Sequence, residues 1–242
     1  MIKFENVVKK YGTKMALDNL SLEIPAGELF AFIGPNGAGK TTTVKLLVGL
    51  LRPTGGRIFI NGFSLQDDYL TAKRYLAYIP DQPFIYEKLS GREFLQFINR
   101  MYQVNSDSFN KSLAKYVELF QMAGYLDQLI ETYSLGMKQR LIIAGTLMRQ
   151  PQIIVVDEPL VGLDPRSARL VKNLFREESK SNGTTIFMST HLLTIAEEVA
   201  DRIGVINNGQ LIMTGTMAEL KKQSRVNGNL EDIFLTITQE SA

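Results

Sequence analysis

The sequence predicts an α/β fold: a mostly parallel sheet with an antiparallel β subdomain and an inserted helical subdomain. Short apolar runs, typical of buried strands, alternate along the chain with segments of helical periodicity. From about Ser90 to Arg149 the periodicity is helical throughout, which indicates an insertion. The 242 residues amount to about one and a half typical domains. We therefore expect a single domain over residues 1–242, with a helical subdomain at about residues 90–150.

The first part of the chain alternates expected strands with turns. Leu29–Ile33 is wholly apolar, as a strand buried on both faces of a sheet would be. Lys40–Leu51 is expected to be a helix, which Arg52-Pro53-Thr54-Gly55-Gly56 ends. The other strands expected here are Ile2–Val8, Leu20–Ile24, Arg57–Ile60 before a turn at Asn61-Gly62, and Tyr75–Ile79.

After the insertion the alternation of strands and helices resumes. Ile153–Val156 has the pattern of a buried strand, and Leu230–Ile237 that of a short helix. Strands that alternate with helices favour parallel pairing. The remaining expected elements are a helix at Arg166–Ser181, a strand at Thr184–Ser189, a helix at Leu192–Ala200, a strand at Arg202–Ile206, and a strand at Gln210–Met213 after the Asn207-Asn208-Gly209 turn.

Composition excludes several classes of protein. The chain has no cysteine and one histidine, so it has neither a disulfide framework nor a Cys/His zinc site. Its 27 basic and 25 acidic residues give a charge of +2, too balanced to favour nucleic acid as a partner. No window reaches the roughly 18 apolar residues of a membrane span, and no secretory signal is evident at the start. We expect a chain that is soluble when isolated.

A phosphate-binding loop is the strongest motif. Gly34-Pro35-Asn36-Gly37-Ala38-Gly39-Lys40-Thr41 matches G-x-x-x-x-G-K-[ST] between an apolar strand and a helix. Glycines let backbone N–H groups turn towards an anion, and the helix N-terminus adds a favourable dipole. Lys40 would reach the β- and γ-phosphates, and Thr41 would place its hydroxyl on Mg²⁺. Thr42 is a further expected contact. A plain glycine-rich turn is the alternative, but the strand and helix on either side favour the core of a P-loop NTPase.

Two acids follow the apolar run Ile153–Val156. Asp157 and Glu158 would lie at the carboxyl end of a buried strand, where α/β sheets bind ligands. Asp157 suits the surroundings of Mg²⁺, and Glu158 is placed to accept a proton from an attacking water. The alternative is a strand that ends in solvated acids with no role in binding. The phosphate loop elsewhere in the chain disfavours this interpretation.

The single histidine follows another apolar strand, Thr184–Ser189. His191 would share the sheet edge with Lys40 and Glu158, where an imidazole can donate to a γ-phosphate oxygen. Taken alone, a histidine at the end of a strand is more often structural. We therefore assign catalytic roles to Lys40, Glu158 and His191 as a set.

Together these residues resemble the ATP-binding subunit of ABC transporters, in one consistent order from Ile2 to Ile237. The resemblance implies a nucleotide-binding core with an inserted helical subdomain, ATP and Mg²⁺ as ligands, and Tyr11 as the aromatic residue that stacks on adenine. It also implies two partners: a second ATP-binding subunit, identical or not, and an integral membrane permease. The expected location is the cytoplasmic face of the cell membrane.

The family's LSGGQ signature is altered in this chain. The matching stretch is Tyr133-Ser134-Leu135-Gly136-Met137, which keeps only Ser134 and Gly136. Ser134 can cap a helix whose N-terminus faces a phosphate. In the family two subunits pack head to tail, so each ATP would lie between Lys40 of one subunit and Ser134 of the other. Val161-Gly162-Leu163-Asp164 resembles the loop that crosses this interface, with Asp164 as its acid.

The glutamine loop of the family is ambiguous here. Tyr78-Ile79-Pro80 is followed by Asp81, so the glutamine, Gln82, comes one residue late. Either residue could face Mg²⁺, as Thr41 and Asp157 would. The apolar residues after it, Phe84, Ile85, Tyr86 and Leu89, suggest a docking site for a short helix of the membrane partner.

These features predict the ATP-hydrolysing subunit of a transporter, and the altered loops and the tail Leu230–Leu235 resemble exporter-type systems. One alternative is a soluble ABC-type ATPase that acts on DNA or ribosomes, although such proteins usually carry two nucleotide sites or a long coiled coil. A small-molecule kinase and a nucleotide-binding regulator without turnover are two more. Glu158 and His191 disfavour the regulator.

Overall fold

The computed structural model describes residues 1–103, 105–160 and 162–239. The chain forms two compact units. The first comprises residues 1–78, 152–159 and 172–242, and the second comprises residues 79–151 and 160–171. Our assignment of a single domain with a helical subdomain at about residues 90–150 stays a prediction.

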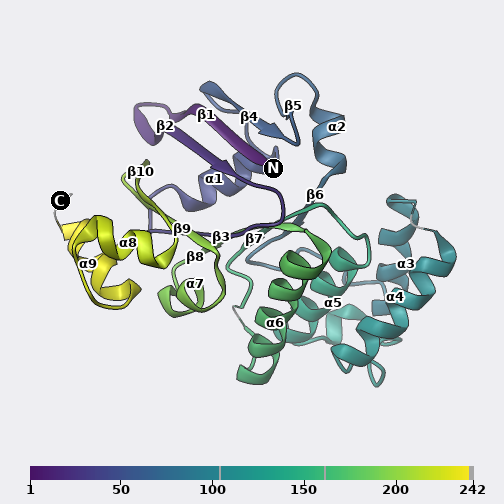
Figure 1. Ribbon diagram of the computed structural model, residues 1–242. Coiled ribbons are helices and arrows are strands. Elements are labelled where there is room, and N and C mark those ends of the chain that lie inside the picture. The colour runs from purple at the N-terminus through teal and green to yellow at the C-terminus, as the bar shows by residue number, and fades with distance from the viewer. Residues whose placement is uncertain (104, 161, 240–242) are drawn as a thin grey trace. The chain divides into compact units, whose positions relative to one another are not determined.

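A six-stranded sheet forms the centre of the first unit (Figure 1). β3 pairs in parallel with β8 and β9, and β8 pairs in parallel with β7. From one edge to the other the strands are β10 (Gln210–Gly215), β9 (Arg202–Asn207), β3 (Leu29–Ile33), β8 (Thr185–Thr190), β7 (Ile153–Asp157) and β6 (Leu76–Ile79). Because β3, β8 and β7 are parallel neighbours, their carboxyl ends meet at one edge. The predicted mostly parallel sheet is confirmed.

A second, antiparallel sheet belongs to the same unit. Its strands are β2 (Lys14–Ile24), β1 (Ile2–Tyr11), β4 (Gly55–Ile60) and β5 (Phe63–Ser64), in that order. β1 and β2 form a hairpin in which Tyr11 pairs with Lys14 and Gly12 has a φ of 57°. Only glycine adopts that backbone freely, so the turn follows from the residue. The predicted antiparallel β subdomain is also present.

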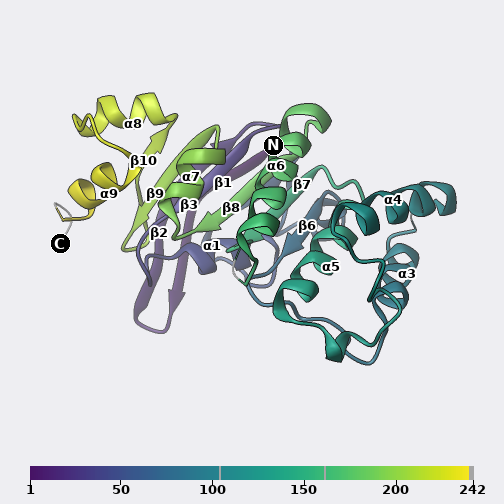
Figure 2. The ribbon, with the colours of Figure 1, turned by 90° about the horizontal axis from the view of Figure 1, so that it is seen from below.

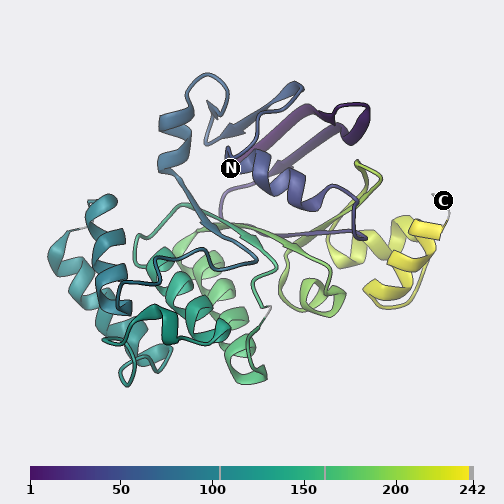
Figure 3. The ribbon, with the colours of Figure 1, turned by 180° about the vertical axis from the view of Figure 1, so that it is seen from behind.

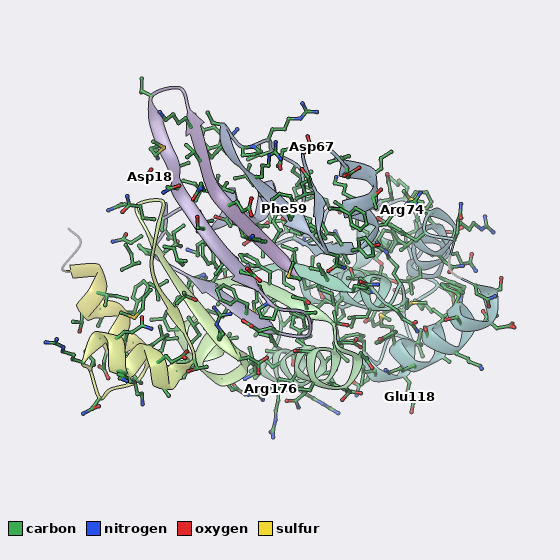
Figure 4. All side chains as sticks on the ribbon, turned by 45° about the horizontal axis from the view of Figure 1, so that its top comes forward. Asp18, Phe59, Asp67, Arg74, Glu118 and Arg176 are labelled. Atoms are coloured by element: carbon green, nitrogen blue, oxygen red, sulfur yellow. The ribbon has the colours of Figure 1, made fainter. Side chains whose placement is uncertain are left out.

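One hydrophobic core joins the two sheets around α1 (Lys40–Leu47), which lies between them in Figure 3. The ring of Phe187 on β8 lies 6.3 Å from that of Phe4 on β1 and 5.4 Å from that of Phe32 on β3. Asp18 on β2, labelled in Figure 4, accepts a hydrogen bond of 2.7 Å from Gln210 Nε2 on β10. The core and this bond hold α1, and therefore the loop before it, against both sheets.

Helices cover the other side of the six-stranded sheet, and α7 crosses it in the foreground of Figure 2. The helices after β7 are α6 (Pro165–Asn182), α7 (Leu193–Val199), α8 (Met217–Ser224) and α9 (Leu230–Gln239). Lys172 of α6 forms an ion pair with Glu198 of α7, and the Leu230 N–H donates to Glu197 Oε2 at 3.1 Å. The C-terminal helix is thereby tied to α7.

The described residues of the second unit are mainly helical. They form α3 (Gly91–Met101), α4 (Ser106–Leu119), the 3₁₀ turn η1 (Ile130–Thr132), α5 (Leu135–Leu147) and the first residues of α6. Ser90 and Glu93 form a capping box that starts α3, and Asn105 caps α4. Among the helices that the structure describes, none combines the length and the apolar character that crossing a bilayer requires.

Several expected boundaries were wrong. The helix expected to reach Leu51 ends at Leu47, because Gly49 takes a φ of 70° and its N–H turns back to the Leu46 carbonyl. β1 and β2 extend beyond the expected strands because their polar hairpin ends pair with each other. α2 (Tyr69–Arg74) and α8 were not predicted.

Candidate active site

The phosphate loop connects β3 to α1, as the motif predicted. A Cβ on Gly34 would lie 2.3 Å from the Ile206 carbonyl oxygen, so no larger residue fits. Gly39 has a φ of 116°, and a Cβ there would lie 2.8 Å from the Ala16 oxygen. The Gly209 N–H holds the loop from outside through a 2.9 Å bond to the Ala38 carbonyl. Both sheets therefore fix the path of this loop before any ligand binds.

Lys40, the first residue of α1, lies folded over the loop. Its Nζ donates to the carbonyl oxygens of Gly34 at 2.7 Å and Pro35 at 3.1 Å. Burial lowers the pKa of this ammonium, and the charges of Glu158 and Asp157 oppose that effect. A triphosphate would give the buried cation the negative charge that the loop carbonyls only partly supply.

Three threonines follow Lys40 and differ in their surroundings. Thr41 is exposed, Thr42 is half-buried and Thr43 is fully buried. The Thr43 hydroxyl donates to the Gly39 carbonyl at 3.0 Å and so closes the loop on itself. We did not predict Thr43, because the motif ends at Thr41 and nothing in its spacing separates the three residues.

The acid pair lies at the end of β7, beside β8. Asp157 is buried and accepts a 2.8 Å hydrogen bond from the Ser189 hydroxyl. Glu158 has a φ of 47°, in the left-handed region, and its N–H donates to the Ser189 carbonyl at 3.0 Å. This turn out of the strand separates the two acids, so that they face different surroundings.

Glu158 and His191 form a close pair. His191 Nδ1 lies 2.7 Å from Glu158 Oε1, and the His191 N–H donates to the same oxygen at 2.9 Å. The Thr190 hydroxyl donates to Glu158 Oε2 at 3.0 Å. A ring with its hydrogen on Nδ1 leaves a lone pair at Nε2, so donation to a phosphate from Nε2 needs the imidazolium form. His191 was predicted from the sequence, whereas Ser189 and Thr190 were not.

Lys40, Asp157, Glu158 and His191 therefore come together at the carboxyl ends of β3, β7 and β8. Tyr11, the predicted adenine contact, is partly exposed at the end of β1, with Lys9 Nζ 5.2 Å from its ring centre. An exposed ring of this kind can stack on a base.

Oxygen donors for Mg²⁺ are present but few. Thr41 offers an exposed hydroxyl and Asp157 a carboxylate, both suited to a hard cation. No group of three or more acidic or histidine side chains that could hold a metal occurs among the described residues. The donor set fits an ion that also takes ligands from phosphate and water, as Mg²⁺ does.

The other predicted site residues belong to the second unit. Ser134 caps α5, its hydroxyl accepting from the Met137 N–H at 3.3 Å. A Cβ on Gly136 would lie 3.0 Å from the Gly162 carbonyl oxygen, so this glycine packs against the predicted interface loop. Asp81 and Gln82 are both exposed just after β6.

The interface loop ends in a capped helix. Asp164 accepts hydrogen bonds from the Ser167 hydroxyl at 2.6 Å and from the Ser167 N–H at 3.0 Å. These bonds hold the pKa of Asp164 below its usual range. Val161, the first residue of that loop, lies outside the described residues.

A parallel sheet with a phosphate loop and an acid pair at one edge defines a P-loop NTPase. A family model described as "ABC transporter" matches residues 17–161. The chain is 35% identical over 225 residues to the bacitracin transport ATP-binding protein BcrA of Enterococcus faecalis, covering 93% of this chain and 72% of that protein. It is 36% identical over 220 residues to the daunorubicin/doxorubicin resistance ATP-binding protein DrrA of Streptomyces peucetius, covering 91% and 66%. This chain belongs to the ABC transporter family, as an ATP-binding subunit.

Solved structures agree with this assignment. An ATP-binding subunit of an ABC transporter superposes with a TM-score of 0.93 at 30% identity, covering 98% of this chain and 99% of that one. The dimeric, post-hydrolysis ATP-binding cassette MJ0796, bound to ADP and Pi, gives 0.80 at 26% identity, covering 89% and 98%. CbiO1 from Clostridium perfringens, part of the transporter complex cbiONQ, gives 0.77 at 26%, covering 98% of both chains. The predicted fold class is confirmed, and ATP is the nucleotide that this family binds and hydrolyses.

Proposed function

We propose that this chain hydrolyses ATP with Mg²⁺ and thereby drives a separate membrane subunit, in the direction of export. One observation carries the catalytic part: the phosphate loop with Lys40 follows β3, the acid pair ends β7, and both strands pair in parallel with β8, so their carboxyl ends lie at the same edge of one sheet. A triphosphate on the loop would therefore have its terminal phosphate near Glu158.

The mechanism is mostly positioning and neutralisation of charge. Lys40 and the loop N–H groups hold the phosphates, and Tyr11 stacks on the adenine. A water attacks the γ-phosphorus in line, its proton passes to Glu158, and ADP leaves. Mg²⁺, held by Thr41 and Asp157, would neutralise phosphate charge. His191 orients Glu158 and, as the imidazolium, donates to the γ-phosphate.

Replacement of the base tests this assignment. We expect Glu158→Gln to slow hydrolysis about 10²- to 10⁴-fold, because the amide does not accept the proton of the water. ATP should still bind, since the loop and Lys40 are intact. Phosphate release gives the rate, and the rise in melting temperature with ATP gives binding.

Lys40→Ala is the companion variant, in which we expect both binding and hydrolysis to be lost. A Glu158→Gln protein that hydrolyses ATP at the original rate would show that Glu158 is not the base.

The head-to-tail dimer follows from the second unit. Ser134 caps the N-terminus of α5, where the helix dipole would favour a phosphate supplied by another subunit, and Gly136 packs against the Gly162 carbonyl of the neighbouring loop. Asp164 lies on the loop proposed to cross the interface. The dimeric cassette among the similar structures supports a second ATP-binding subunit, which could be identical to this chain or unlike it.

A membrane partner and the direction of transport complete the proposal. The similar proteins are named for bacitracin transport and for resistance to daunorubicin and doxorubicin, and resistance is gained when a toxic compound leaves the cell. Phe84 and Tyr86 expose 82% and 62% of their surface, which suits a docking site for a helix of the permease. The chain would then lie on the cytoplasmic face of the membrane, with no nucleic acid as a partner.

A further inference from the structure

Two consecutive residues at the end of β8 carry hydroxyls, and each hydroxyl forms a hydrogen bond with a different acid of the pair. Ser189 Oγ donates to Asp157 at 2.8 Å, and Thr190 Oγ1 donates to Glu158 at 3.0 Å. Ser189 stands opposite Asp157 in the parallel register of β7 and β8. Since successive strand residues point to opposite faces, each hydroxyl meets a different acid. Both hydroxyl residues are almost completely buried.

The Thr190 hydroxyl both accepts and donates a hydrogen bond. The Leu192 N–H donates to Thr190 Oγ1 at 3.0 Å. A hydroxyl has one hydrogen to give, and the carboxylate of Glu158 can only accept. The hydrogen of Thr190 is therefore directed at Glu158 Oε2, and this side chain joins the backbone after β8 to the proposed base.

The two oxygens of Glu158 are unequally occupied. Glu158 Oε1 accepts a hydrogen bond from the His191 N–H and also faces His191 Nδ1. These two contacts take both lone-pair positions of Oε1. Among the contacts of the described residues, Oε2 accepts only from Thr190. One lone-pair position on Oε2 therefore remains for a water.

We propose that Thr190 is a positioning residue for hydrolysis: its hydroxyl orients Glu158 so that Oε2 is the atom that accepts the proton of the water. The inference rests on the proposed role of Glu158 as base. Thr190 acts through its hydrogen bond to Glu158. Without the hydroxyl the carboxylate can rotate, and misplacement of a catalytic group by about 1 Å can cost on the order of 10²-fold in rate.

Thr190→Val tests the proposal, because valine keeps the shape and removes the hydroxyl. With the full chain, MgATP and a phosphate-release assay, we expect kcat to fall about 10- to 100-fold with KM unchanged. Thr190→Ser restores the hydroxyl and should recover most of the rate. If the valine variant does not fold, Thr190→Ala is measured in its place.

Thr185→Val is a matched control on the same strand. Thr185 is also buried, but its hydroxyl accepts from the Gly27 N–H at 3.0 Å, at the other end of β8. We expect this variant to have a lower melting temperature and the original kcat. An equal fall in kcat in both variants would show a structural effect only and would overturn the proposal.

The double variant with Glu158→Gln separates this inference from the proposed function. If Thr190 works through Glu158, adding Thr190→Val to Glu158→Gln should leave the residual rate unchanged. A further fall of the same size would overturn the positioning role. A slow Glu158→Gln protein beside a fully active Thr190→Val protein overturns this inference alone, whereas a fully active Glu158→Gln protein overturns the proposed base and the inference with it.

Discussion

Glu158 combines an unusual backbone with a chemical role. A φ of 47° costs a non-glycine residue on the order of 1 kcal/mol, and such strain persists only where the surroundings impose it. Here the Glu158 N–H donates to the Ser189 carbonyl, and the side chain bonds to Thr190 and His191. The last two residues of β8 and the residue that follows it therefore supply these contacts and hold the proposed base in place.

Asp164 gives a prediction at the scale of one residue. Because the Ser167 hydroxyl and N–H both donate to it, the pKa of Asp164 lies below its ordinary value. A depressed carboxyl pKa stabilises the fold above the unfolded pKa of about 3.9, and this stabilisation is lost as the pH falls through the folded pKa. We expect Ser167→Ala to raise the pKa of Asp164 part of the way back, since the N–H remains.

The measurement is an NMR pH titration of the Asp164 carboxyl in both proteins. The variant should also lose less stability on acidification than the original chain, because part of the acid-sensitive stabilisation is already gone. An Asp164 pKa unaffected by the substitution would mean that the hydroxyl bond adds nothing to the cap.

At the scale of elements, the sequence predicted what burial determines. Leu29–Ile33 was predicted to the residue, because all five side chains are buried and apolar. Boundaries set by turns were less accurate, as Gly49 shows for α1. Of the two missed helices, α8 does carry a signal: Thr216 and Glu219 form a capping box. α2 has no such cap, so its short run carries no comparable signal for the start of a helix.

The contact between α3 and the altered signature gives a prediction for these elements. Tyr133 occupies the position of the signature's leucine, and its hydroxyl donates to the Tyr125 carbonyl at 2.7 Å. Burial raises the pKa of Tyr133 to about 12. A Cβ on Gly91 would lie 2.4 Å from that hydroxyl. We therefore expect Gly91→Ala to reduce the free energy of unfolding by about 1–3 kcal/mol, as overpacking does.

Urea denaturation checks this prediction. Adding Tyr133→Phe should recover part of the loss, because the clashing oxygen is removed while the Leu126 carbonyl, 3.0 Å from the same Cβ, remains. Gly124→Ala is the control, since a Cβ there meets nothing within 4 Å. Additive losses from Gly91→Ala and Tyr133→Phe would show that the two residues do not interact.

For the whole molecule, the order of motifs along the chain was enough to predict that the phosphate loop and the acid pair lie at one edge of the sheet. Gly34, Asp157 and His191 each come at or just after the end of a mostly apolar run. The three runs form parallel neighbouring strands, so their carboxyl ends lie at one edge of the sheet. The hydroxyls of Thr43, Ser189 and Thr190 were beyond prediction. Hydroxyl residues at strand and helix ends follow no spacing rule, and only the register of β7 on β8 brings Ser189 and Asp157 together.

The last prediction concerns the assembly of two chains. Each ATP would bring several negative charges to the interface, and a second subunit would meet them with the N-terminus of α5 and the Ser134 hydroxyl. Slow hydrolysis should preserve this state, so we expect Glu158→Gln with ATP to run at twice the chain mass of 27.2 kDa in size-exclusion chromatography with light scattering. The same variant without nucleotide should be a monomer.

Adding Ser134→Asp places a carboxylate against the phosphate of the facing subunit, and like-charge repulsion should keep the chain monomeric while ATP still binds to the loop at Lys40. A Ser134→Asp double variant that dimerises as readily as Glu158→Gln would show that α5 does not face the nucleotide of a second subunit.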